Sequence, residues 1–386
     1  MSSTQVDAAR LGDWTTSTIG ASWRRYDLQL TIYAALLAVI GLAMAYTNTI
    51  ASGDPALSAG STFTRGLLWA ALAITVNVVS TVLDYRWLRT FAWPIYALNL
   101  ALLAVTLAVG TGPGGSARWI VLGDITVQAS ELSKVLTIAV LANFLANRRD
   151  RLGSVTTIFG ACLLVAPAFV LVLAEPDLGT SLVFMAILGG MLFMSGASLR
   201  WLAALVVTGL ASIPLAWNYV LEDYQKQRLT AFLDPGADPL GAGYQLVQAQ
   251  IAVGAGGATG RGLTNGLQNQ LDFLPVQTTD FVFAVLAEEL GFLGGIVLFL
   301  LFLALMWRLV VAAWRSRDPF GTYFAAGLAS AVFFQFVVNV GMVIGVMPIT
   351  GIPLPFVTHG GASLISLSLA LGIVQSVNVR QTRAEW

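Results

Sequence analysis

The chain turns from a polar segment into an apolar helix at Leu274-Pro-Val-Gln-Thr-Thr-Asp280-Phe-Val-Phe-Ala-Val-Leu-Ala-Glu288-Glu289-Leu-Gly291. Asp280 stands where the glycine-rich segment 220–279 ends and an apolar run long enough to cross a bilayer begins. A carboxylate at such a junction can meet both lipid-anchored and aqueous reactants. Glu288 and Glu289 lie two turns further on, inside the apolar run, where ionisable groups are costly and by default functional.

The composition places the chain among membrane proteins. Of the 386 residues, 57% are hydrophobic and only 10% are charged, whereas soluble domains carry about 25% charged residues. The formal net charge is zero, so no basic field points to nucleic acid as a partner. We therefore expect an all-α polytopic integral membrane protein, with a single membrane domain over residues 1–386.

Cysteine and histidine usage narrows the chemistry. Cys162 is the one cysteine, which excludes an intramolecular disulfide, and His359 is the one histidine. A metal site built from histidines is therefore not expected. Residues 1–25 are mostly polar and precede a first apolar segment of full spanning length, so we expect no cleaved signal peptide.

Ten transmembrane helices are predicted, since a span needs about 20 predominantly apolar residues. They lie near residues 26–46, 66–83, 87–109, 132–146, 155–174, 179–196, 199–219, 281–313, 321–347 and 362–379. This leaves a tail at 1–25, a large loop at 220–279 between the seventh and eighth helices, and a tail at 380–386.

Lysine and arginine set the orientation, because they concentrate in cytoplasmic loops. With the N-terminus inside, the inner loops and tails hold Arg10, Arg24, Arg25, Arg86, Arg89, Arg148, Arg149, Arg151, Arg200, Arg308, Arg315, Arg317, Arg380 and Arg383. The outer loops hold Arg65, Arg118, Lys226, Arg228 and Arg261, and Lys134 falls within the fourth helix. Both termini are therefore expected in the cytoplasm, and Asp280 on the outer face.

The outer loop at 110–130 is predicted to form a short hairpin that leads into the fourth helix. Lys134 follows Glu131 by three residues, on the same helical face and one turn into the membrane. Two interpretations are open: an internal ion pair that joins helices, or a cation positioned for an anionic ligand. Arg118 and Trp119 in the same loop favour the second.

Two carboxylates flank Pro176, which ends the fifth helix. Asp177 either caps the sixth helix or also contacts a metal ion or substrate, and capping would not prevent that contact.

The large loop 220–279 concentrates the outer cations Lys226, Arg228 and Arg261. Its glycine-rich run at 254–262 offers N–H groups that can approach phosphate, which alone is a weak signal. Its middle has the spacing of an amphipathic helix lying on the membrane surface. The apolar positions of that helix are Leu246, Val247 and Ile251.

The last outer loop, 348–361, contains three prolines and three glycines, which keep it non-helical. At membrane depth such a segment must be buried in protein or line a cavity. Within it, His359 is expected to be a hydrogen-bonded structural residue rather than a catalytic acid or base.

Together these segments resemble the SEDS family, the shape, elongation, division and sporulation proteins typified by RodA and FtsW. The matching pieces occur in family order over most of the chain. They are Gly115-Ser-Ala-Arg-Trp-Ile, Gln128-Ala-Ser-Glu with Lys134, Glu175-Pro-Asp-Leu-Gly-Thr, Arg228 through Asp238-Pro, Gly243-Tyr-Gln, Leu274-Pro through Thr279-Asp-Phe, Ala287-Glu-Glu-Leu-Gly and Gly351-Ile-Pro-Leu-Pro-Phe.

The chain departs from the family pattern in three places. The family's Pro-Ser-Glu is Ala129-Ser-Glu here, its Pro-Glu-x-His-Thr-Asp is Pro275-Val-Gln-Thr-Thr-Asp, and its Ser-Tyr-Gly-Gly-Ser is Thr358-His-Gly-Gly-Ala. The acid and the histidine that accompany the aspartate are absent, which leaves Val276 and Thr278 without an assigned role.

The resemblance implies a peptidoglycan glycosyltransferase that polymerises lipid II at the outer face of the bacterial cytoplasmic membrane and releases undecaprenyl pyrophosphate. It also implies a class B penicillin-binding protein as the crosslinking partner, alongside other membrane proteins of the elongation machinery. The pattern at Asn339–Gly351 favours the RodA-like, elongation branch of the family.

The residue types suit this reaction. Glycosyl transfer needs a base for the acceptor hydroxyl and positive charge near the departing pyrophosphate. We expect Asp280 to be that base, or to hold a divalent cation, Mg²⁺ or Mn²⁺, that activates the acceptor. The candidate substrate-binding residues are Arg118, Trp119, Lys134, Lys226, Arg228 and Arg261. Trp119 is placed there for packing on a sugar or the polyprenyl chain, although an interfacial tryptophan is often only an anchor.

Supporting roles are expected for a further set of polar residues: Glu131, Asp177, Glu288, Glu289 and His359. In particular, Glu288 and Glu289 are expected to pair with buried cations and so hold the outer cavity together.

Two other classes of function compete. A lipid II flippase would use Lys134, Glu288 and Glu289 along a translocation path, but a transporter needs polar groups at both faces, and here they cluster outside. A non-enzymatic scaffold for a penicillin-binding protein explains the large loop but not the gathering of a carboxylate with several cations. O-antigen ligases also use lipid-linked glycans, and the motif order argues against them.

Overall fold

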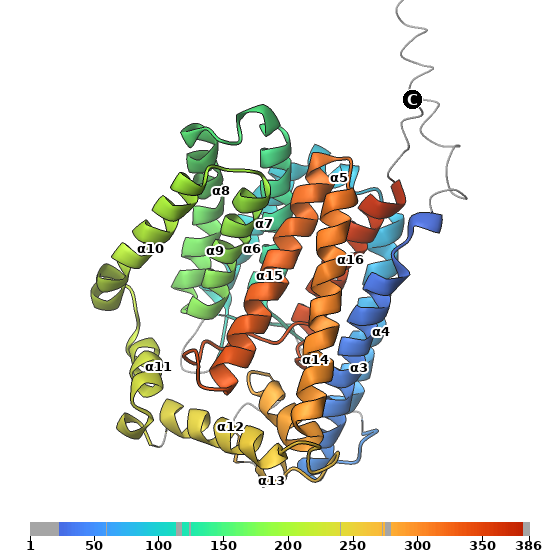
Figure 1. The fold of residues 1–386 in the computed structure, drawn as a ribbon, viewed down its shortest axis with the longest axis vertical. Coiled ribbons are helices and arrows are strands. Elements are labelled where there is room, and N and C mark those ends of the chain that lie inside the picture. Colours follow the sequence, from blue (N-terminus) through green and yellow to red (C-terminus); the bar gives the residue numbers. More distant parts are fainter. Residues whose placement is uncertain are drawn as a thin grey trace, which may run out of the picture.

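The computed structural model describes residues 23–58, 60–112, 118–122, 125–239, 241–271, 273–274 and 279–380. The predicted tails fall almost wholly outside these residues, as do Val276 and Thr278. Within them, nine helices are long and apolar enough to cross a membrane. They are α3 (Leu28–Ala51), α4 (Thr62–Val82), α6 (Ala92–Val109), α7 (Ala129–Ala146), α8 (Val155–Ala174), α10 (Leu199–Tyr219), α14 (Val282–Arg315), α15 (Pro319–Val343) and α16 (Gly361–Arg380) (Figure 1).

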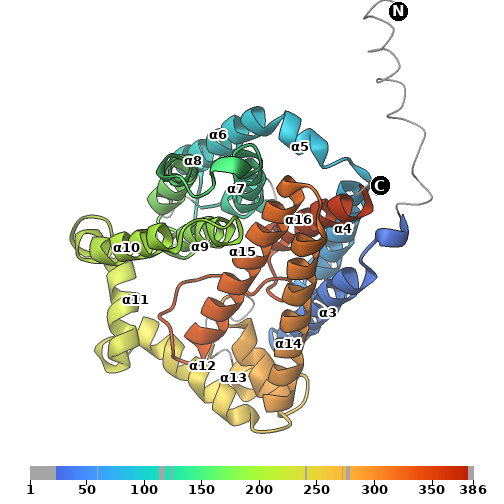
Figure 2. The same cartoon turned by 45° about the horizontal axis from the view of Figure 1, so that its top comes forward.

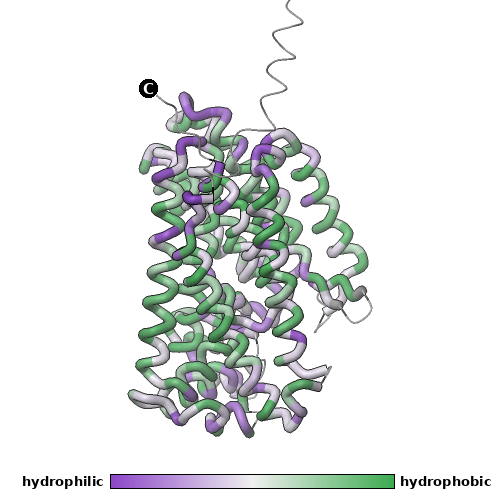
Figure 3. The backbone as a smooth tube through the Cα atoms, turned by 90° about the vertical axis from the view of Figure 1, so that its right-hand side faces the viewer, coloured by the Kyte–Doolittle hydropathy of each residue, from purple (hydrophilic) through white to green (hydrophobic). Residues whose placement is uncertain are grey.

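A tenth apolar helix, α9 (Leu178–Met194), is slightly shorter at 17 residues and packs inside the bundle. Each of the ten helices coincides with a predicted span, so the all-α, multi-pass membrane fold is confirmed. Helix α3 begins, and helix α16 ends, at the same end of the bundle. Figure 1 shows the segments between α10 and α14 towards the opposite end. Hydrophobic residues run along the helices, and hydrophilic residues are most frequent near the two ends (Figure 3).

The third predicted helix is broken in two. A short α5 (Arg86–Thr90) is separated from α6 by Phe91, whose backbone leaves the helical region at φ −99° and ψ 21°. Pro94 lies in the first turn of α6, where a missing N–H is tolerated, but it would remove a hydrogen bond from a continuous helix. The chain therefore starts a new helix here.

The hairpin predicted before the fourth helix is present. Strand β1 (Ile120–Leu122) pairs antiparallel with β2 (Ile125–Val127), with Ile120 opposite Val127. Directly after it, α7 begins. The short helices η1 (Trp23–Arg25) and η3 (Arg149–Arg151) lie in arginine-rich segments of the chain.

The large loop forms an arm along one side of the bundle (Figure 2). It contains α11 (Asp223–Leu233), η4 (Pro235–Ala237), α12 (Ala242–Gly256) and α13 (Leu267–Gln270). The helix predicted from amphipathic spacing is present as α12. Leu246, Ala249 and Ala252 are buried against the bundle, whereas Val247 and Ile251 are exposed. Small residues face inward because α12 packs closely on α14.

The glycine-rich run after α12 packs against a kink in α14 and supplies hydrogen bonds to it. Gly291 has φ 67° and ψ −165°, which breaks the helical hydrogen-bond ladder. The carbonyls of Glu288 and Glu289 instead accept hydrogen bonds from the N–H groups of Arg261 (3.0 Å) and Gly262 (2.9 Å). In return, the N–H of Phe292 donates to the carbonyl of Gly257, and that of Leu293 to the carbonyl of Ala258. The backbone groups expected to be available for a ligand are therefore used inside the protein.

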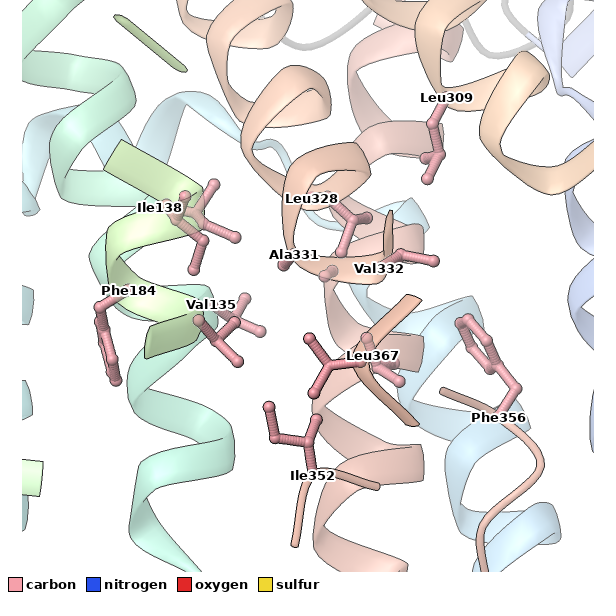
Figure 4. Close-up of a cluster of buried hydrophobic side chains, with 14 of the residues drawn as sticks. Val135, Ile138, Phe184, Leu309, Leu328, Ala331, Val332, Ile352, Phe356 and Leu367 are labelled. Atoms are coloured by element: carbon pink, nitrogen blue, oxygen red, sulfur yellow. The ribbon is translucent and has the colours of Figure 1, made fainter. Parts of the chain in front are cut away.

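Helix α15 lies at the centre of the bundle, where it contacts α7, α9 and α14. The loop between α15 and α16 (residues 344–360) runs back into this core rather than over the surface. Ile352 and Phe356 from the loop join Val135, Leu328 and Leu367 in one buried apolar cluster (Figure 4). This meets the requirement that non-helical backbone at membrane depth be covered by protein.

The close approach of α12 to α14 yields a test with a matched control. A Cβ added at Gly256 would lie 1.9 Å from the carbonyl oxygen of Ala287, whereas one added at Gly254 would meet nothing within 4 Å. We expect Gly256→Ala to lower the free energy of unfolding by at least about 1–3 kcal/mol through the clash. Gly254→Ala, two residues earlier on the exposed face of the same helix, should be neutral or stabilising by about 0.5–1 kcal/mol.

The comparison is made by thermal unfolding of the two purified variants in the same detergent. Equal melting temperatures for Gly256→Ala and the wild type would contradict the packing of α12 on α14.

Candidate active site

Asp280 is held at the start of α14 by a buried amide on α15. The Nδ2 atom of Asn339, a residue with 0% exposure, donates to the backbone carbonyls of Asp280 (3.1 Å) and Ile352 (2.8 Å). One side chain thus ties the turn before α14 to the loop 344–360. Since both bonds are made in the interior, losing them would leave two buried carbonyl groups without these donors.

A second tie comes from the loop itself. The hydroxyl of Thr358 donates to the carbonyl of Thr279 (3.2 Å) and accepts from the N–H of Leu354 (2.7 Å). The backbone on both sides of the Asp280 carboxylate is therefore fixed before any substrate arrives, as a catalytic group requires.

The carboxylate of Asp280 and the guanidinium of Arg228 converge on Gly351. A Cβ at Gly351 would lie 3.4 Å from Oδ2 of Asp280 and 3.5 Å from an Nη atom of Arg228. Gly351 has φ +72°, a conformation that glycine adopts without strain. Three elements distant in sequence, α11, the start of α14 and the loop 344–360, thus bring a carboxylate and a cation together.

Arg118 is the second cation of this group. Its Nε donates to the carbonyl of Glu175 (3.2 Å), and its Nη2 donates to the hydroxyl of Tyr224 (2.6 Å) and to the carbonyl of Pro176. The Arg228 guanidinium lies 5.7 Å from the centre of the Tyr224 ring. Tyr224, which lies on α11, therefore contacts both Arg118 and Arg228.

Asp177 caps α9, as one of the two interpretations held. Its Oδ1 accepts from the N–H of Thr180 (3.0 Å), and its Oδ2 accepts from the side-chain amide of Gln128 (3.3 Å). Two donors therefore orient the Asp177 carboxylate, which lies near Arg118.

Burial raises the pKa of the Asp280 carboxyl above its ordinary value, and Arg228 acts in the opposite direction. Thr279 also lowers this pKa by hydrogen bonding, while the negative charge of Asp177 raises it. The result is a carboxylate of increased basicity with a cation beside it, which suits a general base working near neutral pH.

Glu175 is the most unusual ionisable group of this region. Its side chain is 0% exposed, and neither carboxylate oxygen has a hydrogen-bond partner among the described residues. Burial, with a further contribution from Asp177, raises its pKa to about 8, although Arg118 lowers it. A carboxyl group with this pKa is mostly protonated, and so neutral, at pH 7.

Three other predicted substrate-binding cations have their own local contacts. Lys134 makes the internal ion pair with Glu131, at 2.8 Å between Nζ and Oε1, and both are buried. This pair lies within α7 and does not join two helices, and the other interpretation, a cation positioned for an anionic ligand, stays a prediction. Lys226 faces the exposed Asp223 at 3.7 Å. Arg261 lies at the kink of α14, where its Nε donates to the carbonyl of Ala255.

Glu288 and Glu289 were expected to pair with buried cations, and this was wrong. Across the described part of the chain, no ion pair involves either residue. Instead, Glu288 Oε1 accepts from the N–H of Gln268 (3.0 Å), and Glu289 Oε1 accepts from the amide of Asn269 (3.2 Å). They hold the short helix α13 against α14.

The remaining predicted residues are Trp119 and His359. Trp119 is half-buried and extends the hairpin through a backbone bridge to Thr111. His359 lines a cavity with Gly66 and Trp69, and burial together with Arg65 lowers its pKa. It lies in the loop 344–360 beside α4. Among the described residues, no hydrogen bond or ion pair joins His359 to the Asp280 group.

A metal ion at Asp280 finds an incomplete set of protein ligands. No three histidine, cysteine, aspartate or glutamate side chains gather to hold a metal within the residues that the structure describes. Asp280 would supply one carboxylate, and the cation of Arg228 stands beside it. The residues do not fit a resident Mg²⁺ or Mn²⁺ ion, and no reaction step is assigned to one.

Sequence reasoning missed several residues that shape the site. Asn339, Thr358 and Tyr224 act through contacts between elements, which spacing along the chain does not reveal. Glu175 was visible as a carboxylate before a helix-breaking proline, but its complete burial was not. A buried amide in an apolar helix such as Asn339 was the one usable signal, because polar groups at membrane depth need a reason to be there.

Comparisons with known proteins agree with this architecture. A model of the FtsW, RodA and SpoVE family, described as cell cycle proteins, matches residues 27–383. The chain is 40% identical to the peptidoglycan glycosyltransferase MrdB of Escherichia coli over 313 residues, covering 81% of this chain and 84% of that protein. It is 36% identical to the stage V sporulation protein E of Bacillus subtilis, covering 91% and 96% of the two chains.

Solved structures are also similar. A chain from a peptidoglycan synthase complex that coordinates polymerization and crosslinking has a TM-score of 0.77 and 31% identity, covering 92% of this chain and 99% of that chain. The rod shape determining protein RodA of Thermus thermophilus has a TM-score of 0.67 and 28% identity, covering 95% and 98%.

The neutral form of Glu175 gives a test in the pH dependence of stability. The folded chain keeps this proton up to about pH 8, whereas the unfolded chain releases it near the ordinary value of 4.5. Between these values the folded state binds more protons, so the free energy of unfolding falls as pH rises, by up to about 1.4 kcal/mol per pH unit. Glu175→Gln removes this proton and its contribution.

The stability difference between Glu175→Gln and the wild type should therefore grow in favour of the variant from pH 5 to pH 8. Melting temperatures in detergent at several pH values provide the measurement. Parallel curves for the two proteins would rule out the neutral buried carboxyl.

Proposed function

This chain belongs to the family of cell cycle proteins typified by FtsW, RodA and SpoVE, and we propose that it is a peptidoglycan glycosyltransferase that polymerises lipid II. The predicted family is confirmed, and the predicted activity agrees with the names of its relatives. The observation that carries the mechanism is the convergence of the Asp280 carboxylate and the Arg228 guanidinium on Gly351.

Asp280 acts as the general base. It takes the proton from the acceptor hydroxyl as that oxygen attacks the anomeric carbon, while the bond from this carbon to the pyrophosphate oxygen breaks. Its increased basicity favours proton uptake, while the charge of Arg228 lowers its pKa and so favours the ionised form beforehand. Asn339 and Thr358 position it through the backbone.

Arg228 and Arg118 receive the negative charge of the leaving pyrophosphate. Guanidinium groups bind phosphate oxygens through two parallel hydrogen bonds, which suits them to this task. Arg118 would have to exchange its contacts to Pro176 and Tyr224 for phosphate oxygens.

The protein is a multi-pass membrane protein, and the proposal places it in the bacterial cytoplasmic membrane with both termini inside and Asp280 outside. The excess of arginine in the inner segments supports this orientation. A class B penicillin-binding protein is the proposed partner, supported by the similarity to a chain of a peptidoglycan synthase complex. The similarity to a rod shape determining protein RodA supports a role in cell shape and elongation.

The decisive experiment compares the wild type with Asp280→Asn. Each protein is purified with its candidate partner and incubated with labelled lipid II, and the glycan chains are resolved by gel electrophoresis. Loss of the base should lower the polymerisation rate by at least about 100-fold. Asp223→Asn, a change of the same chemistry at an exposed position on α11, is the control and should retain the rate.

Equal glycan synthesis by Asp280→Asn, with normal folding and partner binding, would eliminate the catalytic role of Asp280. If the wild type makes no polymer but moves lipid II across vesicle membranes, the protein is a flippase instead.

A further inference from the structure

The imidazole of His359 borders a small interior cavity that joins three parts of the fold. The cavity has a volume of about 10 Å³ and lies between α3, the first turns of α14 and the loop 344–360. Its lining side chains are apolar except for Asn48 on α3 and His359. A second cavity, on the side of α4, shares Gly41, Val357 and His359 with the first, so the imidazole borders both.

Asn48 brings an unsatisfied acceptor to the first cavity. The residue is only 8% exposed, and its Oδ1 has no hydrogen-bond partner among the described residues. Buried side-chain acceptors are normally satisfied by protein groups or by ordered water. A donor within the cavity would satisfy this one.

The backbone carbonyl of Val357 is a second acceptor beside the same cavity. It packs so closely on α3 that a Cβ added at Gly41 would collide with its oxygen. Val357 is 1% exposed, and within the described ranges its carbonyl accepts no hydrogen bond. The cavity therefore offers one acceptor from α3 and one from the loop.

His359 supplies the complementary donor. A neutral imidazole carries one N–H group and one acceptor nitrogen. Burial and the positive charge of Arg65 on α4 both lower the pKa of His359, which favours the neutral form. The other side chains that line the two cavities, from α3, α4, α14 and α16, are uncharged. In the described part of the chain, no hydrogen bond reaches the imidazole.

We propose that this cavity binds one ordered water molecule, which accepts the imidazole N–H of His359 and donates to Asn48 Oδ1 and to the carbonyl of Val357. An interior site of at least about 10 Å³ with two to four polar partners is enough to hold one water. One donor and two acceptors match the lone pairs and the two protons of that molecule.

Through this water, His359 is a positioning residue for Asp280, a role that rests on the proposed polymerase function. The water joins α3 to the turn that contains Thr358, whose hydroxyl donates to the carbonyl of Thr279. The N–H of Gly360 donates to the carbonyl of Thr358 and closes this turn around His359. A displacement of the turn is therefore passed to the backbone directly before Asp280.

The water site is tested by NMR on a single residue. His359 is the one histidine of the chain, so protein labelled with ring-¹⁵N histidine and purified without a histidine tag gives the signals of this residue alone. At neutral pH we expect one protonated ring nitrogen, with a rotating-frame NOE from its proton to a bound water. Asn48→Leu removes one acceptor at similar volume and should abolish this NOE, whereas Asp223→Asn, at an exposed position on α11, should retain it.

This spectrum does not depend on activity, so it decides on the water site even if the chain does not polymerise lipid II. A wild-type N–H proton without a water NOE, or one lost to rapid exchange with bulk solvent, would overturn the proposal. An unchanged NOE in Asn48→Leu would overturn it as well.

The positioning role is tested by polymerisation kinetics of the partner-bound protein. His359→Phe keeps a ring but loses the donor, and it should lower kcat by at least about tenfold with little change in the KM for lipid II, because a misplaced catalytic group slows the chemical step. His359→Asn and His359→Gln return an N–H donor near the positions of Nδ1 and Nε2, and one of the two should restore most of the lost rate. A wild-type kcat in His359→Phe, or failure of both amides to restore it, would refute the positioning role.

Discussion

The hydrogen bonds of one buried amide, that of Asn339, hold together the three segments on which the site depends. The amide lies on α15 at the centre of the bundle and donates to the turn before α14 and to the loop 344–360. In an apolar interior no water is available to donate hydrogen bonds to these backbone carbonyls. The position of Asp280 therefore follows from the packing of the bundle and not from the large loop that precedes it.

At the kink in α14 and in the loop 344–360, other parts of the protein satisfy the hydrogen bonds of the irregular backbone. At Gly291 the kink in α14 is repaired by the glycine-rich turn after α12, through hydrogen bonds in both directions. Glycines at 256 and 260 allow this approach, because a Cβ at either would collide with a carbonyl of α14. The same logic buries the loop 344–360 in the core. The arm and the loop are thus built into the bundle and present Arg228 to Asp280.

Much of the fold was predictable because lipid imposes strict rules on sequence. All ten spans follow from apolar length, and the hairpin before α7 was also predicted. The site was predictable only in part. Asp280, Arg228 and Arg118 come together, whereas the contacts of Lys134, Lys226 and Arg261 are local ones that were not predicted. These cations contact Glu131, Asp223 and the carbonyl of Ala255. Such contacts depend on side-chain direction and packing, which cannot be predicted from the number of charged residues in a loop. The same applies to Glu288 and Glu289, whose partners lie on α13.

The most direct test of this account is the rate of lipid II polymerisation by partner-bound Asn339→Ala, measured at saturating lipid II. Asn99→Ala is the matched control, since Asn99 is an equally buried amide that bonds to Thr137 on α7. If Asn339 positions Asp280, its loss should lower kcat by roughly 100-fold, the effect of misplacing a catalytic group by about 1 Å. Asn99→Ala should keep kcat near that of the wild type. A wild-type kcat in Asn339→Ala would contradict the central claim.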